Sequence, residues 1–100
     1  MRNRTILVTS VDIDPAAADD FNRWYDETHL PEILACPGFV SCTRFECAGG
    51  REPRYLAIYE LESEDALTTP EMQRVRGWGD QFPVVKNFHE RIYHAIHQAP

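Results

Sequence analysis

The sequence predicts an α+β fold with the order strand, helix, strand, strand, helix, strand, which is the ferredoxin-like or split βαβ arrangement. Two observations support this order. Four segments are rich in β-branched and aromatic residues, and two regions between them begin with helix-capping residues. The arrangement implies a four-stranded antiparallel sheet with the helices on one of its faces.

The first strand and helix have the clearest signals. Residues 5–12 (TILVTSVD) are rich in β-branched side chains and predict a strand. Asp14 can then act as an N-cap, and Pro15 suits the first helical turn because its missing N–H needs no partner there. Aromatic and other side chains follow at spacings of three and four, which predicts one buried helix face: Phe21, Trp24, Tyr25 and Thr28.

Pro31 is expected to interrupt this helix. Proline removes a backbone donor and disfavours helical angles at the residue before it, here Leu30. We therefore expect a kink or restart at residues 29–31, followed by a short turn over residues 31–34. The Cys-Pro-Gly sequence at residues 36–38 is a strong stop signal.

Residues 39–47 and 54–62 predict a β-hairpin with its turn at residues 48–51. Strict alternation in the first of these strands would place Phe39, Ser41, Thr43 and Phe45 on one face and Val40, Cys42, Arg44 and Glu46 on the other. The second strand is apolar on both faces. A sheet that is apolar on both sides must be covered on both sides, so a second copy of the chain is expected on the face without helices.

The second helical region has two start signals. Ser63 can act as an N-cap, and Thr69 with Pro70 predicts a fresh start for a helix that runs to about Arg76. The Gly-Trp-Gly sequence at residues 77–79 ends it, and a last strand is expected over residues 87–97.

Composition limits the classes of function. The 100 residues are 43% hydrophobic and 26% charged, as in an ordinary globular protein, and we expect one domain over residues 1–100. The net charge of −6 argues against nucleic acid or an anionic membrane as a partner.

No apolar stretch is long enough for a membrane span, and the N-terminus does not resemble a secretory signal. Three cysteines fit no simple paired framework, so reduced thiols and a cytoplasmic location are expected: Cys36, Cys42 and Cys47.

The Trp-Tyr-Asp-Glu-Thr-His-Leu-Pro sequence at residues 24–31, followed by Cys-Pro-Gly-Phe at residues 36–39, resembles the EthD-like group of the dimeric α+β barrel superfamily. That group has a Trp and a downstream His-x-Pro in its first helix and a Pro-Gly before its second strand. The resemblance implies a homodimer with two sheets face to face and a pocket between each sheet and its helices. Because the superfamily includes monooxygenases, cyclases, dehydratases and isomerases, the fold alone does not choose a reaction.

His29 and Tyr25 are the expected catalytic pair. They lie four residues apart on one helix side, where an imidazole can exchange a proton and a phenol can hydrogen-bond a substrate oxygen. The alternative for His29 is a helix-end histidine that bonds the carbonyl groups freed by Pro31. The family pattern favours a pocket role.

Four further residues are candidates for substrate binding. The rings of Trp24 and Trp78 could hold a flat ligand, and Trp78 could act as a lid between its two glycines, although core packing explains Trp24 at least as well. Arg44 could pair with a ligand carboxylate, but such an arginine more often pairs with a strand neighbour such as Glu60. Tyr59 is a candidate with strand packing as the alternative.

No metal site or cofactor is expected. The cysteine spacings lack a C-x2-C pair, and nothing in the spacing of His89, His94 and His97 requires a metal. The sequence has no dinucleotide fingerprint, no phosphate loop and no serine nucleophile elbow. Cys36 and Cys42 lack the electropositive setting of a nucleophile.

Three functions remain open. The leading hypothesis is a cofactor-independent dehydratase, isomerase or cyclase that acts on a small cyclic or aromatic metabolite by proton transfer. The second is a monooxygenase of phenolic substrates without metal or flavin. The third is a protein that binds a small molecule without converting it.

Overall fold

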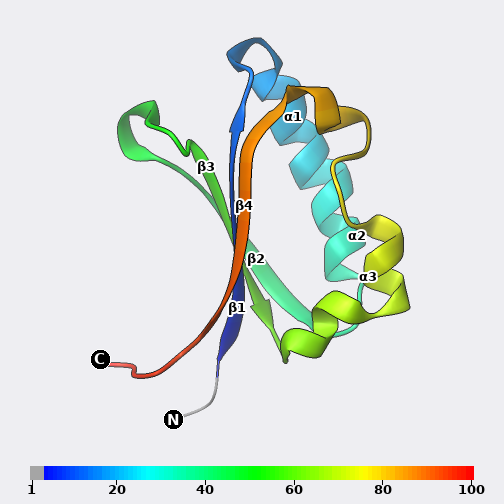
Figure 1. Ribbon diagram of the computed structural model, residues 1–100, viewed down its shortest axis with the longest axis vertical. Coiled ribbons are helices and arrows are strands. Elements are labelled where there is room, and N and C mark those ends of the chain that lie inside the picture. The colour runs from blue at the N-terminus through cyan, green and yellow to red at the C-terminus, as the bar shows by residue number, and fades with distance from the viewer. Residues whose placement is uncertain (1–3) are drawn as a thin grey trace.

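The four strands form one antiparallel sheet in the order β2-β3-β1-β4 (Figure 1). A computed structural model describes residues 4–100, so residues 1–3, on which the expectation of no secretory signal partly depends, lie outside the described residues. The strands are β1 (Thr5–Ile13), β2 (Phe39–Glu46), β3 (Tyr55–Leu61) and β4 (Val85–His94). Their order and directions confirm the predicted ferredoxin-like fold.

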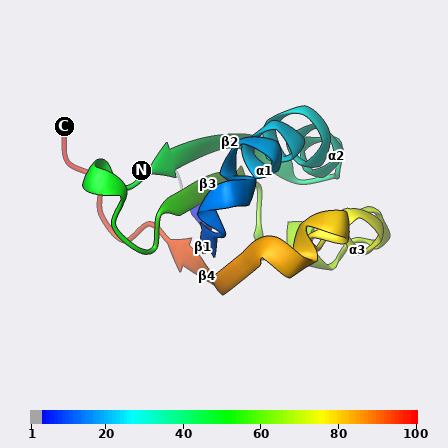
Figure 2. The same ribbon diagram turned by 90° about the horizontal axis from the view of Figure 1, so that it is seen from above.

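The helices form a layer on one face of the sheet (Figures 1 and 2). The layer contains α1 (Ala18–Trp24), a π-helical turn (Tyr25–His29), α2 (Leu30–Leu34) and α3 (Pro70–Val75), with 3-10 turns at Pro15–Ala17, Glu64–Thr68 and Gly79–Val84. No helix within residues 4–100 has the length and apolar character needed to cross a bilayer.

Pro31 does not break the helix, which corrects the expectation of a kink at this site. Leu30 keeps helical angles, with φ −61° and ψ −47°, and its N–H donates to the carbonyl oxygen of Tyr25, five residues earlier. The wider π-helical turn accommodates the proline without a restart. Residues 18–34 therefore continue in one direction, as Figure 1 shows.

A bulge near Val40 changes the predicted face of β2. Phe39 pairs with Leu61, but Ser41 pairs with Glu60, so one residue of β2 has no direct partner in β3. The bulge places Phe39 on the helix side of the sheet together with the later residues Cys42 and Arg44. Strict alternation, which put Phe39 opposite Arg44, was therefore wrong at this position.

The expected helix caps are confirmed. The carboxylate of Asp14 accepts a hydrogen bond from the N–H of Ala16 at 3.1 Å. The hydroxyl oxygen of Ser63 accepts one from the N–H of Asp65 at 3.2 Å, and the hydroxyl oxygen of Thr69 accepts one from a first-turn N–H of α3 at 3.1 Å. These bonds satisfy donors that have no partner within the helix.

The last strand begins and ends earlier than predicted. It spans Val85–His94 because Val85 pairs with Ile13 at one end of β1 and His94 pairs with Thr5 at the other. The chain beyond residue 95 has passed the end of β1, so His97 lies outside the sheet and is exposed.

The two faces of the sheet differ in their cover. On the helix side, Phe21 is fully buried at the centre of a cluster that includes Tyr55 and Leu7. The other face carries half-buried and exposed apolar side chains: Ile6, Val8, Phe45, Leu56, Ile58 and Tyr93.

Candidate functional site

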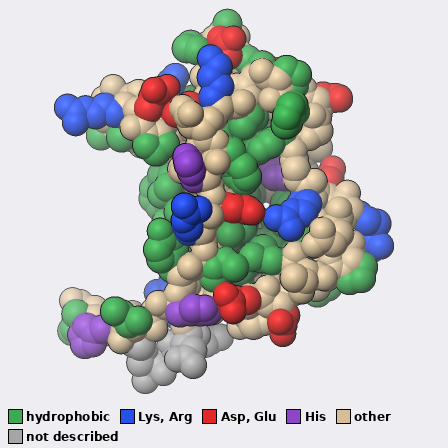
Figure 3. Space-filling model, in the orientation of Figure 1, with side chains coloured by type: hydrophobic (Ala, Val, Ile, Leu, Met, Phe, Trp, Pro, Cys, Tyr) green, Lys and Arg blue, Asp and Glu red, His purple; other side chains and the backbone are tan. Residues whose placement is uncertain are grey.

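A cavity of about 340 Å³ lies between the helix side of the sheet and the helical layer. Figure 3 shows the corresponding hollow, with hydrophobic side chains gathered on its floor. Its lining is mostly aromatic and aliphatic: Thr9, Tyr25, His29, Ile33, Tyr59, Met72, Arg76, Gly77, Trp78, Phe82, Val85, Phe88 and Glu90. An apolar cavity with a few converging polar groups is the usual form of a small-molecule site.

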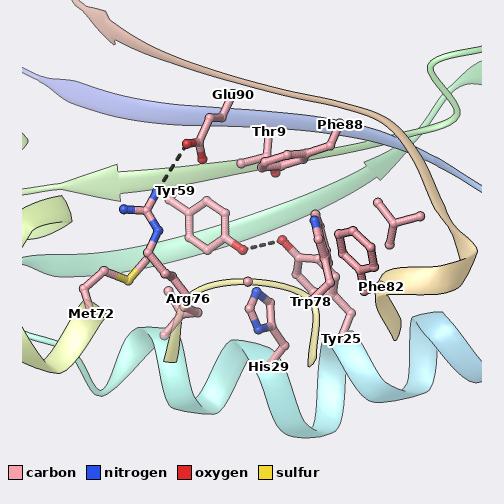
Figure 4. Close-up of a pocket in the computed structure, with 13 residues that line it drawn as sticks. Thr9, Tyr25, His29, Tyr59, Met72, Arg76, Trp78, Phe82, Phe88 and Glu90 are labelled. Atoms are coloured by element: carbon pink, nitrogen blue, oxygen red, sulfur yellow. Dashed lines mark hydrogen bonds and ion pairs between the residues drawn. The ribbon is translucent and has the colours of Figure 1, made fainter. Parts of the chain in front are cut away.

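The π-helical turn places His29 against this cavity. The side chain is only 8% exposed, and its ring stacks on that of Trp24 with 4.7 Å between centroids. The edge-to-face contact with Tyr25 measures 4.9 Å. In Figure 4 the imidazole points from the helix into the cavity and makes no hydrogen bond to the other residues drawn. Its nitrogen atoms are therefore available to a bound molecule.

His29 is neutral at pH 7. Burial, and to a smaller extent the positive charge of Arg44, lower the pKa of its imidazole to about 4. A neutral imidazole has one nitrogen that accepts a hydrogen bond and one that donates. It can accept a proton from a ligand hydroxyl without first losing one.

Tyr25 and Tyr59 form a hydrogen-bonded pair of hydroxyl groups at the same cavity (Figure 4). Tyr25 comes from the π-helical turn and Tyr59 from β3, so the pair connects the helical layer to the sheet. Burial raises the pKa of both phenols, and both stay protonated at neutral pH. Only one O–H is used between the two hydroxyl groups, so the second can donate to a ligand oxygen.

Trp24 and Arg44 do not line the cavity but contact residues that line it. Trp24 is half-buried and stacks on His29. The Arg44 guanidinium lies 4.2 Å from the centroid of the Tyr25 ring. It donates to a carboxylate oxygen of Asp26 at 2.8 Å and to the side-chain oxygen of Asn22 at 2.7 Å. Both residues therefore contact side chains that line the cavity, namely His29 and Tyr25.

The expected pairing of Arg44 with Glu60 is wrong. Glu60 instead lies 3.8 Å from Arg4, on the other side of the sheet. The two residues cannot pair because they lie on opposite faces of the sheet: Arg44 faces the helices and Glu60 faces away from them.

Trp78 lines the cavity from the loop after α3. It stands between Gly77 with φ +105° and Gly79 with φ +52°, backbone angles that favour glycine. Its ring makes an edge-to-face contact with Phe88 at 5.1 Å and lies 5.9 Å from the ring of His29. The structure thus brings together four of the six residues singled out in the sequence, namely His29, Tyr25, Tyr59 and Trp78.

Sequence reasoning missed the charged pair of the cavity. Arg76, at the end of α3, donates to a carboxylate oxygen of Glu90 in β4 at 3.3 Å. The only sequence signal was a small basic excess formed by Arg74 and Arg76. Phe82 and Phe88 were also not predicted to line the cavity. No pattern of neighbouring residues indicates that the loop of Phe82 and the edge strand β4, which carries Phe88, meet over the helix side of the sheet.

The histidines of the last strand have other surroundings. The Nδ1 of His94 is hydrogen-bonded to the hydroxyl of Thr5 at 3.2 Å, and its Nε2 lies 3.5 Å from a carboxylate oxygen of Glu64. His89 is opposite Ser10 on the face without helices. Within residues 4–100, no group of three or more His, Cys, Asp or Glu side chains is placed to hold a metal ion.

The thiols are poorly suited to nucleophilic attack. Burial raises the pKa of Cys42 to about 11 and also raises that of Cys36, which keeps both protonated. Cys47 is exposed, and all three cysteines are free.

The fold and the cavity define this chain as an α+β protein with the subunit fold of the dimeric α+β barrel proteins. A family model described as "Domain of unknown function (DUF4286)" matches residues 4–98, so the chain belongs to that family. No curated protein sequence matches the chain.

Solved structures of similar fold come from several functional groups. SnoaB, a cofactor-independent oxygenase from Streptomyces nogalater, has 19% sequence identity and a TM-score of 0.71 over 97% of each chain. The heme-degrader MhuD from Mycobacterium tuberculosis has 14% identity and a TM-score of 0.69, with 96% of this chain and 99% of that chain covered. An ethyl tert-butyl ether degradation (EthD) family protein from Bacillus halodurans has 14% identity and a TM-score of 0.61, with 88% and 96% covered. At these identities the likeness establishes the fold, including the fold shared with EthD proteins.

Proposed function

We propose that this protein is a cofactor-independent oxygenase of a flat, electron-rich phenolic substrate. The observation that carries the proposal is a neutral, buried imidazole that opens onto an aromatic-walled cavity beside a pair of protonated tyrosines. The cavity suits a flat aromatic molecule, and the polar groups suit the removal of a phenolic proton.

Proton transfer from the substrate is the first step. His29 accepts the proton of a substrate hydroxyl, while the second O–H of the Tyr25–Tyr59 pair donates to the resulting phenolate oxygen. With the imidazole pKa at about 4 and an ordinary phenol near 10, the transfer costs about 8 kcal/mol. The ion pair formed between imidazolium and phenolate offsets part of this cost in a cavity with a mostly apolar lining. The site therefore favours phenols that are more acidic than tyrosine.

The phenolate then supplies the electrons for oxygen. One electron passes from the phenolate to O2, and the resulting radicals combine at the ring carbon para to the oxygen. The imidazolium of His29 returns its proton to the peroxide, which then loses water as that carbon loses its hydrogen, and a carbonyl group forms. For 1,5-dihydroxynaphthalene the balanced reaction is C10H8O2 + O2 → C10H6O3 + H2O, in which the substrate provides all four electrons and no external reductant is needed.

The likeness to a cofactor-independent oxygenase supports this choice of reaction over the leading sequence-based hypothesis. A dehydratase or isomerase would use the same proton transfer at His29 without oxygen. A binding protein would hold the ligand without converting it. Dependence on oxygen separates these three functions.

Oxygen uptake with 1,5-dihydroxynaphthalene is the direct test. With ¹⁸O2, the quinone product is expected to carry one labelled oxygen atom and the other to appear in water. Formation of hydrogen peroxide with an unlabelled product would indicate an oxidase. Conversion under argon would indicate a lyase or isomerase. The absence of conversion across a panel of dihydroxyaromatics, with and without a carboxylate on the ring, would contradict the proposal.

Variants connect the reaction to the site. His29→Ala is expected to lower turnover at least about a hundredfold, the usual effect of losing a positioned acid or base. Tyr25→Phe should have a similar effect, because it removes a donor to the developing phenolate. The matched control is His89→Ala, which removes a histidine from the face of the sheet opposite the cavity. Equal turnover in His29→Ala and His89→Ala would exclude the mechanism.

The assembly and location of the protein belong to the same proposal. We infer a homodimer of one-domain subunits, related in architecture to EthD-like proteins, in which the apolar faces of two sheets pack together. Support comes from the exposed aromatic side chains of Phe45 and Tyr93 on that face, which are 48% and 52% exposed in the single chain. The three free thiols favour a reducing compartment such as the cytoplasm.

A further inference from the structure

The charged pair at the cavity has no part in the proton transfer proposed above. Arg76 lies at the end of α3 and Glu90 in β4, so their contact joins the helical layer to the sheet. Among the residues that line the cavity, they are the two with formal charges, since His29 is neutral. Figure 3 shows acidic and basic side chains facing each other across the hollow.

The ion pair between them is weak. A single nitrogen–oxygen contact of 3.3 Å holds it, and the two side chains are 41% and 39% exposed. Pairs with this exposure contribute little to stability. A guanidinium has five N–H donors in a rigid fork, and the contact with Glu90 uses one of them. Arg76 can therefore change partners at little cost.

The position of Arg76 relative to the aromatic walls indicates what the new partner would be. In Figure 4, Arg76 and Glu90 lie toward one end of the cavity and Phe82 lies toward the other, with His29, Tyr25 and Tyr59 between them. A flat ligand that fills this space would have one end at the guanidinium and its ring system among the aromatic side chains. Arginine binds planar carboxylates in two-point geometry, which a carboxyl group on an aromatic ring can provide.

We propose that Arg76 is a specificity-determining residue that selects planar aromatic substrates carrying a carboxylate, and that this carboxylate displaces Glu90 on binding. The proposal rests on the proposed function, since it names the substrate class of the same cavity. In this proposal Glu90 increases selectivity: its carboxylate competes with that of the ligand for Arg76 and repels an anion that does not reach the guanidinium.

The binding experiment compares two probes of the same ring system. One is 1-hydroxy-2-naphthoate, which is an anion, and the other is its methyl ester, which is neutral. Binding is measured by quenching of tryptophan fluorescence in oxygen-free buffer, so that no turnover is required. Trp78 lines the cavity and serves as the reporter.

Arg76→Gln is expected to weaken binding of the anion at least about tenfold, because a hydrogen-bonded charge pair is worth about 1.5–3 kcal/mol. Binding of the ester should change less than about twofold. Glu90→Gln should strengthen binding of the anion and leave the ester unaffected, since it removes the competing carboxylate. Arg74→Gln is the matched control, because this arginine is also exposed at the end of α3 but does not line the cavity.

The outcomes separate this proposal from a purely structural ion pair. If Arg76→Gln and Glu90→Gln weaken both probes equally, the pair only holds the cavity together and the proposal is overturned. It is also overturned if the parent protein binds both probes equally, or binds neither below about 1 mM. Charge-selective binding without oxygen uptake would leave this proposal intact and contradict the oxygenase function. Oxygen uptake with neutral and acidic substrates at equal rates would support the oxygenase function and contradict the selection of carboxylates by Arg76.

Discussion

The neutral state of His29 has a measurable effect on stability. Its pKa is about 4 in the folded chain, because of burial and the nearby charge of Arg44, and about 6.5 in an unfolded chain. Between these two values the unfolded chain binds a proton at this residue and the folded chain does not. The neutral imidazole of His29 therefore makes its full contribution to the free energy of unfolding above pH 6.5, and this contribution is lost as the pH falls toward 4.

The size of the loss follows from the two pKa values. Integration between pH 7.5 and pH 5 gives a decrease of about 2 kcal/mol, and the full difference of about 2.5 pH units corresponds to about 3 kcal/mol. Other groups also titrate in this range, so the absolute curve of the parent protein is not diagnostic. The variant His29→Gln removes this one titration and leaves the others in place.

Urea unfolding measured by tryptophan fluorescence at pH 7.5, 6.5, 5.5 and 5, at one protein concentration, provides the assay. From pH 7.5 to pH 5 the parent is expected to lose about 2 kcal/mol more stability than His29→Gln. His97→Gln is the control, because it removes a histidine from the exposed C-terminal segment. Curves for the parent and His29→Gln that stay parallel within about 0.5 kcal/mol, the size of an ordinary surface effect, would refute the neutral, buried state on which the proposed mechanism depends.

Two further predictions concern the fold and the assembly. Gly38→Ala should destabilise the protein by about 2 kcal/mol or more, seen as a lower urea midpoint, because Gly38 has φ +87° and a new Cβ would lie 2.7 Å from the Cβ of Ala66. An unchanged midpoint would show that the loop can relax. Phe45→Glu should raise the dissociation constant of the homodimer at least about thirtyfold in sedimentation equilibrium, since loss of an aromatic interface residue costs about 2 kcal/mol or more. A parent protein that is monomeric at high concentration would contradict the dimer.

The order of elements could be predicted because it depends on signals between neighbouring residues. Asp14, Ser63 and Thr69 cap the helices as expected, since a cap is a bond between groups two or three residues apart. The alternation of β3 likewise indicated that Tyr55, Ala57, Tyr59 and Leu61 share one face, and the structure shows that the helices cover this face. The spacing of Tyr25 and His29 placed both on one side of the helix, and both line the cavity.

The rest depended on contacts between distant residues. The bulge near Val40 depends on how β2 pairs with β3 and changes the face of every residue after it. The π-helical turn keeps the helix continuous through Pro31, against the local preference of the residue before a proline. Arg76 and Glu90 meet only because α3 and β4 pack on opposite sides of one cavity.

Local periodicity and capping therefore predicted the class of fold and the helix starts, and they placed Tyr25 and His29 on one side of a helix. Tertiary structure decided the composition of the cavity, the neutral state of His29 and the position of the charged pair. The physical reason is that burial and pairing across the sheet depend on groups far apart in the chain, while a cap or a helical face involves only residues a few positions apart.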